Sequence, residues 1–205
     1  MKPILFSTPM VQAILAGRKT QTRRVIKFPE DFDGREVYKN GHFGVKYSRE
    51  DGTLYRHFPK YQPGDILYVR ETFRKLVDCK TGDFHSYDYK ADMPEKFHRL
   101  FPYKWQPSLF MPKDAARIFL QVTDVTAERL QDITLKDAIA EGIECIHESD
   151  VKVYRNYLLK EKLGSTNPVN SFSSLWNSIN AKTSPWGKND WVWVYTFKKI
   201  ENPNQ

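Results

Sequence analysis

The sequence predicts an α+β fold that is mainly β, a small and mostly antiparallel barrel with peripheral helices and surface insertions. The chain of 205 residues contains strand-like aromatic and β-branched runs separated by helices, without the regular alternation of a doubly wound sheet. It lacks the glycine-rich motifs of dinucleotide-binding and phosphate-loop proteins. Its hydrophobic content of 40% supports one core, and its two cysteines exclude a disulfide framework. We expect a single domain over residues 1–205.

The first element is a helix that begins near Thr8 and ends at Gly17. Thr8 suits the N-cap and Pro9 the first helical position, and apolar residues recur at i, i+3 and i+4 from Val11. Because glycine readily adopts the left-handed conformation that ends many helices, we expect a change of direction at Gly17. A strand that ends at 25–26 follows.

The next segment carries Asp-Gly and Asn-Gly turn signals between two strand candidates, His42–Tyr47 and Thr53–Phe58. We interpret it as a hairpin-like surface insertion at about 29–60. A Pro-Gly-Asp turn then leads into Ile66–Phe73, whose composition and alternation predict a strand.

A second insertion is expected at about 76–107, irregular apart from a strand at His85–Tyr89 and a short helix at Glu95–Phe101. A third insertion is expected at about 146–170. The remaining predicted elements are a strand over Ala116–Val122, a helix capped by Thr134 and ended by Gly142, a helix over Phe172–Ile179, and a closing strand over Trp191–Phe197.

The charge of the chain suggests an anionic partner. The net charge is +7 and the isoelectric point is near 9.3, which favours nucleic acid or a nucleotide, although a solvated surface of mixed charge gives the same total. Four cations lie close together in the sequence, at Arg18, Lys19, Arg23 and Arg24. No apolar stretch is long enough for a membrane helix, so we expect a cytoplasmic protein with no membrane partner.

Metal and cysteine chemistry are not expected. The five histidines are scattered without the spacing of a ligand pair, so we expect no metal and no cofactor. Neither Cys79 nor Cys145 lies in a context that would activate a thiolate.

The turn after the first helix is the first candidate for chemistry, because Lys19 and Thr22 directly follow a helix-ending glycine. A threonine hydroxyl becomes a nucleophile only when a base takes its proton, and lysine serves as that base only if burial lowers its pKa. The alternative is a solvated basic turn in which Thr22 is a local cap.

Glu71 is the second candidate. Strand alternation groups it with Leu67 and Val69, so a barrel would direct its carboxyl toward an apolar interior and raise its pKa. The alternative is an ion pair with an arginine such as Arg23 or Arg24. An ionised Glu71 beside Lys19 would raise the lysine pKa, so either Glu71 starts protonated or Lys19 stays charged and stabilises an oxyanion.

The tryptophans near the C-terminus allow two interpretations. Trp186, Trp191 and Trp193 suit stacking on nucleic-acid bases. Alternation instead places Trp191, Trp193, Tyr195 and Phe197 on one face of the closing strand, which favours a core role for these four. Trp186 lies in a Ser-Pro-Trp-Gly loop, and its role stays open.

Two motifs in chain order resemble the ASCH domain family, whose fold is a PUA-like β-barrel. The run Gly17–Arg24 resembles its G-x-K-x-x-[ET]-x-R signature, and Gly64–Glu71 is similar to its second motif. Phe119–Val125 with Ala138–Ile143 resembles the strand and helix that follow. The whole chain resembles the longer members found in phages and prophages.

The resemblance implies a barrel cleft that handles RNA or modified nucleosides. In one bacterial branch, an amidohydrolase removes the acetyl group of N4-acetylcytidine. Its lysine, threonine and glutamate correspond to Lys19, Thr22 and Glu71, with Thr22 as nucleophile, Lys19 as base and Glu71 as proton donor or orienting group. The expected substrate contacts are Arg18, Arg23, Arg24, Arg70 and Trp186. The alternatives are a non-catalytic RNA-binding module and, less favoured, a ribonuclease in the same cleft.

Overall fold

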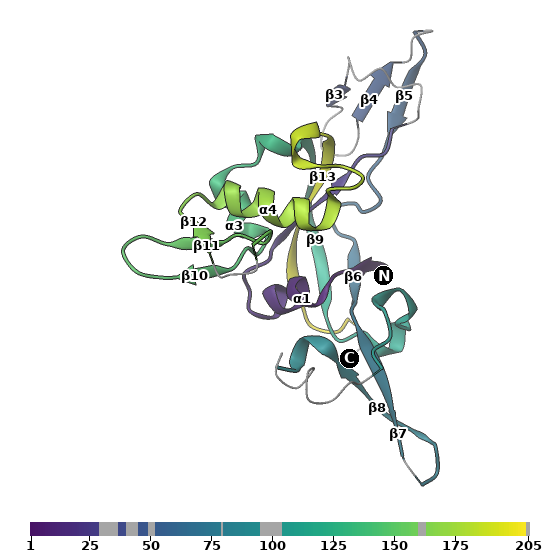
Figure 1. Cartoon of the computed structure of the whole chain (residues 1–205). Coiled ribbons are helices and arrows are strands. Elements are labelled where there is room, and N and C mark those ends of the chain that lie inside the picture. The colour runs from purple at the N-terminus through teal and green to yellow at the C-terminus, as the bar shows by residue number, and fades with distance from the viewer. Residues whose placement is uncertain are drawn as a thin grey trace. The chain divides into compact units, whose positions relative to one another are not determined.

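The structure, a computed structural model, describes residues 1–28, 37–39, 45–48, 52–78, 80–94, 104–159 and 163–203. These residues form an α+β fold dominated by strands, and they contain no closed barrel (Figure 1). None of the helices in these ranges has the length and apolar character needed to cross a bilayer.

The helices and strands follow one another along the chain as β1 (Lys2–Leu5), α1 (Thr8–Leu15), β2 (Gln21–Val25), β3 (Val37–Lys39), β4 (Val45–Ser48), β5 (Leu54–His57), β6 (Ile66–Arg70), β7 (Phe73–Val77), β8 (Phe84–Tyr89), β9 (Phe119–Arg129), α3 (Leu135–Ala140), β10 (Cys145–His147), β11 (Val153–Arg155), β12 (Gly164–Ser165), α4 (Pro168–Asn180) and β13 (Trp191–Ile200). Short 3-10 turns η2 to η6 connect some of them, and η6 covers Trp186–Lys188.

The chain divides into two compact units. Unit 1 comprises Met1–Gly17, Asp65–Gln121 and Lys198–Gln205, and unit 2 comprises Arg18–Gly64 and Val122–Phe197. Strands β9 and β13 each contribute residues to both units.

In unit 1, β1 pairs in parallel with β6, and β6 pairs antiparallel with the first residues of β9. The inward residues of β6, Leu67 and Val69, are almost fully buried, as the predicted alternation requires. A hairpin of β7 and β8 adds a small core in which Phe73 packs with Met111 and Ala115.

In unit 2, β2 pairs antiparallel with β13 in a register that sets Thr22 opposite Tyr195 and Arg24 opposite Trp193. Helices α3 and α4 cover one face of this pair (Figure 1). The core on that side contains side chains from both strands and both helices: Val25, Ala138, Phe172, Trp176, Val192 and Val194. Residues of the opposite parity, including Thr22, therefore point to the other face of the strands.

The glycine signals at both helix ends are confirmed. Gly17 and Gly142 adopt left-handed conformations, with φ of +72° and +87°. Thr134 caps α3 by accepting a hydrogen bond from the backbone N–H of Asp137. The first helix differs in one detail, because its N-cap is Ser7, which makes no side-chain cap bond.

The strand predicted over Ile66–Phe73 is interrupted. β6 ends at Arg70, and Phe73 begins β7, where its backbone exchanges two hydrogen bonds with Gln106. Glu71 lies between the two strands, and its backbone N–H points to the sulfur of Met111. The single strand predicted from the composition is therefore two strands, because β6 pairs with β9 whereas β7 pairs with β8.

Each of the three predicted insertions contributes strands to a small antiparallel sheet. The first holds β3, β4 and β5, and the third holds most of a sheet formed by β10, β11 and β12. The second is more regular than expected, since β7 pairs along its length with β8. The helix predicted over Glu95–Phe101, the start of the strand predicted over His42–Tyr47, and Cys79 lie outside the described residues.

Candidate functional site

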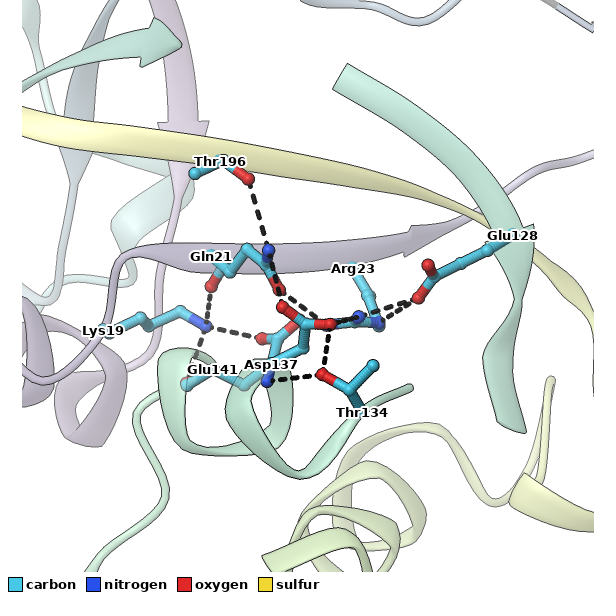
Figure 2. Close-up of polar contacts among 8 residues, drawn as sticks. All are labelled: Lys19, Gln21, Arg23, Glu128, Thr134, Asp137, Glu141 and Thr196. Carbon is cyan, nitrogen blue, oxygen red and sulfur yellow. Dashed lines mark hydrogen bonds and ion pairs between the residues drawn. The ribbon is translucent and has the colours of Figure 1, made fainter. Parts of the chain in front are cut away.

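Lys19 lies in a buried polar cluster of unit 2 (Figure 2). Its backbone forms an isolated β-bridge with Glu141, which directly precedes the left-handed Gly142 at the end of α3. The ammonium donates to the carbonyl of Gln21 at 2.8 Å, the carbonyl of Glu141 at 2.9 Å and Oε2 of Glu141 at 2.8 Å. Three acceptors thus engage all three protons of a charged lysine.

Arg23 extends the cluster. It donates to Oε1 of Glu141 at 3.1 Å, and its Nε and Nη2 both donate to Oε1 of Glu128, at 3.0 and 2.7 Å. Gln21 joins the cluster by donating to Asp137 and accepting from Arg23 (Figure 2). Lys19 and Arg23 therefore meet three carboxylates, Glu128 of β9, Asp137 of α3 and Glu141 directly after α3, which satisfies a pair of cations with almost no exposed surface.

Burial lowers the pKa of Lys19, and the carboxylate of Glu141 opposes that shift. A lysine that acts as a base requires a lowered pKa, so this shift has the required direction. The geometry, however, is that of an ammonium ion, because a neutral amine has only two N–H donors for three acceptors. In this arrangement Lys19 acts as a charged link between the start of β2 and the end of α3.

Thr22 belongs to the other face of β2. Gln21 and Arg23 point into the α3 cluster, so strand alternation directs Thr22 and Arg24 to the opposite side. Thr22 is 2% exposed and lies opposite Tyr195 on β13. The structure thus brings Lys19 and Arg23 together and separates both of them from Thr22 by the thickness of the strand.

Aromatic side chains and cations surround Thr22 on this side. We call this surface the Thr22 face and define it by Thr22, Arg24, His57, Lys60, Tyr61, Trp193 and Tyr195. Tyr61 packs edge-on against Tyr195 with ring centroids 5.2 Å apart, and His57 stacks on Trp193 at 6.2 Å. The Lys60 ammonium lies 5.3 Å from the Tyr61 ring centroid.

The aromatic part of the Thr22 face is buried, and its cations are exposed. Tyr61, Trp193 and Tyr195 have exposed fractions of 5% or less, whereas Arg24 and Lys60 are exposed. Burial raises the pKa of Tyr195 to about 12, although hydrogen bonds from the backbone of Lys60 and Tyr61 oppose this. The phenol is therefore neutral at physiological pH.

Glu71 lies in unit 1 and is 1% exposed. Arg117 donates to both of its carboxylate oxygens, at 2.9 and 3.1 Å, and also pairs with Asp92. Its guanidinium lies 3.9 Å from the ring centroid of Tyr89. Burial raises the pKa of Glu71, and Arg117 opposes that shift. The arginine that binds Glu71 is therefore Arg117, not Arg23 or Arg24, and it also lines an open pocket with 199–202.

The other predicted substrate contacts each bind a different part of the chain. Arg18 is exposed and donates to the carbonyls of Gly142 and Ile143. Arg70 in unit 1 donates to the carbonyl of Leu109. Trp186 is partly buried in unit 2.

The core interpretation holds for three of the four aromatic residues of the closing strand. Trp193, Tyr195 and Phe197 are buried, as the core interpretation predicts, whereas Trp191 is partly exposed beneath the Arg129 guanidinium at 4.8 Å. Trp186 packs edge-on against Phe172, at the margin of the core that α4 forms.

Sequence reasoning missed the partners that define these sites. Glu141, Arg117 and Tyr61 are distant in sequence from the residues they contact; Lys19 and Glu141, for example, are 122 positions apart. Of the three, only Glu141 had a local signal, its position just before a helix-ending glycine.

Comparisons of the chain with protein-family models, with curated proteins and with solved structures find no match. The function is therefore inferred from the Thr22 face and from the Lys19 cluster behind it.

Proposed function

We propose that the protein binds RNA or a modified pyrimidine nucleoside at the Thr22 face. The observation that carries this proposal is the partly exposed ring of His57, which stacks on the buried Trp193, on the same face as the exposed cations Arg24 and Lys60. Aromatic rings stack on bases and cations neutralise phosphates, and this pairing is typical of surfaces that bind single-stranded nucleic acid.

The proposal includes an ASCH-type domain with a PUA-like barrel. In support, the two motifs lead into strands in the order that the resemblance implies. Gly17 is left-handed before β2, and Gly64 has φ of +89° before β6.

Binding of a short labelled oligouridine, followed by fluorescence anisotropy at low salt, tests the proposal. Arg24→Ala should weaken binding about tenfold, the loss expected for one charge-assisted contact. Lys152→Ala is the control, because this lysine is also an exposed cation of unit 2 but lies outside the Thr22 face. Absence of binding by the unmodified protein, or an equal loss in both variants, would contradict the proposal.

A second candidate is hydrolysis of an N4-acetylcytidine-like amide, favoured by one observation. Burial shifts the pKa of Lys19 down and that of Glu71 up, the directions required of a base and of a proton donor. In this reaction the Thr22 hydroxyl attacks the acetyl carbonyl, the C–N bond breaks, and the departing amine takes a proton. Water then hydrolyses the threonyl ester to acetate. For this reaction Lys19 must release its acceptors, lose a proton and reach the Thr22 face, because the structure holds it as an ammonium ion on the other side of β2.

Release of acetate and cytidine from N4-acetylcytidine tests this second candidate. Thr22→Ala should abolish turnover, whereas Thr22→Ser keeps a hydroxyl and should retain part of it. If the unmodified protein releases no more acetate than Thr22→Ala, the hydrolase is excluded while the binding proposal stands.

A further inference from the structure

Two segments of unit 2 that are distant in sequence carry cations and no carboxylates. Residues 18–28 and 52–62 contain seven lysines and arginines but no aspartate or glutamate. Two of these cations, Lys19 and Arg23, are buried in the α3 cluster, whereas the other five are exposed: Arg18, Arg24, Lys27, Arg56 and Lys60.

Ring contacts bring the two segments together beside the Thr22 face. His57, at the end of β5, lies between Phe28 at 6.0 Å and Trp193 at 6.2 Å. Tyr61 then packs against Tyr195, the residue opposite Thr22. The C-terminal part of the first insertion therefore supplies part of the surface around Thr22.

The orientation of β5 separates its cations into two groups. Because His57 faces Trp193, alternation directs the exposed Arg56 away from it. Lys60 lies beyond the end of the strand, over the ring of Tyr61, and is therefore at the Thr22 face. Phe58 also lies beyond the end of β5, so the alternation that directs Arg56 away does not fix its direction, and its side chain is 56% exposed.

We propose that the insertion makes the Thr22 face a site for a single strand of RNA and not for a free nucleoside alone. Lys60, with Arg24 from the other segment, neutralises backbone phosphates, and Phe58 stacks on a base that neighbours the nucleotide held between them. This inference rests on the proposed function and adds the class of its ligand. A free nucleoside has no phosphate and no neighbouring base, so it uses neither Lys60 nor Phe58.

The test compares three variants within the same short segment, Phe58→Ala, Lys60→Ala and Arg56→Ala. Each receives a labelled oligouridine over a range of salt concentrations and, separately, free cytidine. Lys60→Ala should weaken RNA binding and reduce the slope of log affinity against log salt by about 0.7, the value for one phosphate of a single strand. Phe58→Ala should weaken it about tenfold with the slope unchanged. Arg56→Ala should change neither quantity, and none of the three should alter cytidine binding.

Several outcomes would overturn the inference. If Arg56→Ala matches Lys60→Ala, the attraction is diffuse charge and not a built site. Equal affinity for oligouridine and for an oligoglutamate peptide leads to the same conclusion. If Arg24→Ala weakens RNA binding but Lys60→Ala and Phe58→Ala do not, the proposed function survives and the insertion has no role in it. If the unmodified protein binds no RNA, both proposals fail.

All three substituted side chains lie at least partly at the surface, and matching thermal unfolding of the variants would verify that each is folded.

Discussion

Glu141 is the main partner of the Lys19 ammonium, because it supplies two of the three acceptors described above. Removing one partner of a buried ion pair leaves the other charge without compensation. We therefore expect Lys19→Met to lower the free energy of unfolding by about 3 kcal/mol in urea titrations. The pair between Lys2 and Asp65 is partly exposed, and Lys2→Met should cost less than about 1 kcal/mol.

A double-mutant cycle separates the pair from its surroundings. Lys19→Met combined with Glu141→Gln should cost clearly less than the sum of the two single variants, because each single variant leaves an unmatched group. Additive losses in the free energy of unfolding would mean that the two residues act independently. A loss near zero for Lys19→Met would mean that this ion pair does not stabilise the fold.

Glu71 makes stability depend on pH in a defined direction. Its pKa in the folded protein lies above the ordinary value of 4.5 because burial disfavours the charge, so the folded state holds the proton more tightly than the unfolded state. The folded protein therefore loses stability relative to Glu71→Gln as the pH rises from about 4.5 through the folded pKa. Urea titrations of both proteins between acidic and neutral pH measure this difference.

The control for that experiment is Glu148→Gln, because the Glu148 side chain is 72% exposed. Its substitution should leave the pH profile nearly unchanged. A Glu71→Gln profile that runs parallel to the profile of the unmodified protein would contradict the raised pKa.

These residues show which parts of the site can be predicted from the sequence. A nucleophile candidate next to a helix-ending glycine is a local pattern, and both Gly17 and the strand that follows lie where it predicts. The partners of the charged groups depend instead on distant segments meeting in space. Lys19 with Glu141 and Glu71 with Arg117 are joined over 122 and 46 positions, and no local pattern encodes such pairings.

At the scale of elements, the left-handed turn that links α1 to β2 is set by glycine. A side chain at Gly17 would meet no neighbouring atom, so the cost of adding one arises from the backbone conformation alone. We expect Gly17→Ala to lower the free energy of unfolding by about 1 kcal/mol. Gly187 has equal space and no positive φ, so Gly187→Ala should lie within about 0.5 kcal/mol of the unmodified protein or stabilise it.

Strand β2 shows why predicting an element does not predict its site. Its composition and the preceding turn identify the strand, but every second residue faces α3 and the others face the aromatic side. Spacing alone groups Lys19 with Thr22, whereas the strand separates them. Which of the two faces receives helices depends on α3 and α4, whose contacts with β2 involve residues more than a hundred positions away.

At the scale of the whole molecule, the net charge of +7 matters less than where the cations lie. Arg23 and Lys19 are neutralised by carboxylates inside unit 2, so two of the four cations in the Arg18–Arg24 run contribute nothing to a surface field. If RNA binding depends on total charge, any exposed lysine is equivalent to any other. If it depends on the Thr22 face, only cations at that face should affect the binding affinity.

Two charge-matched double variants distinguish these cases. One replaces Arg24 and Lys60 by glutamine, and the other replaces Lys75 and Lys80, which are exposed residues of unit 1; each removes two positive charges. The first should reduce the slope of log affinity for oligouridine against log salt by about 1.4, at about 0.7 for each phosphate that is no longer neutralised. The second should leave the slope unchanged, because its lysines serve no built site. Equal slopes for the two variants would mean that the protein attracts RNA through its overall charge, and the Thr22 face would then have no special part in binding.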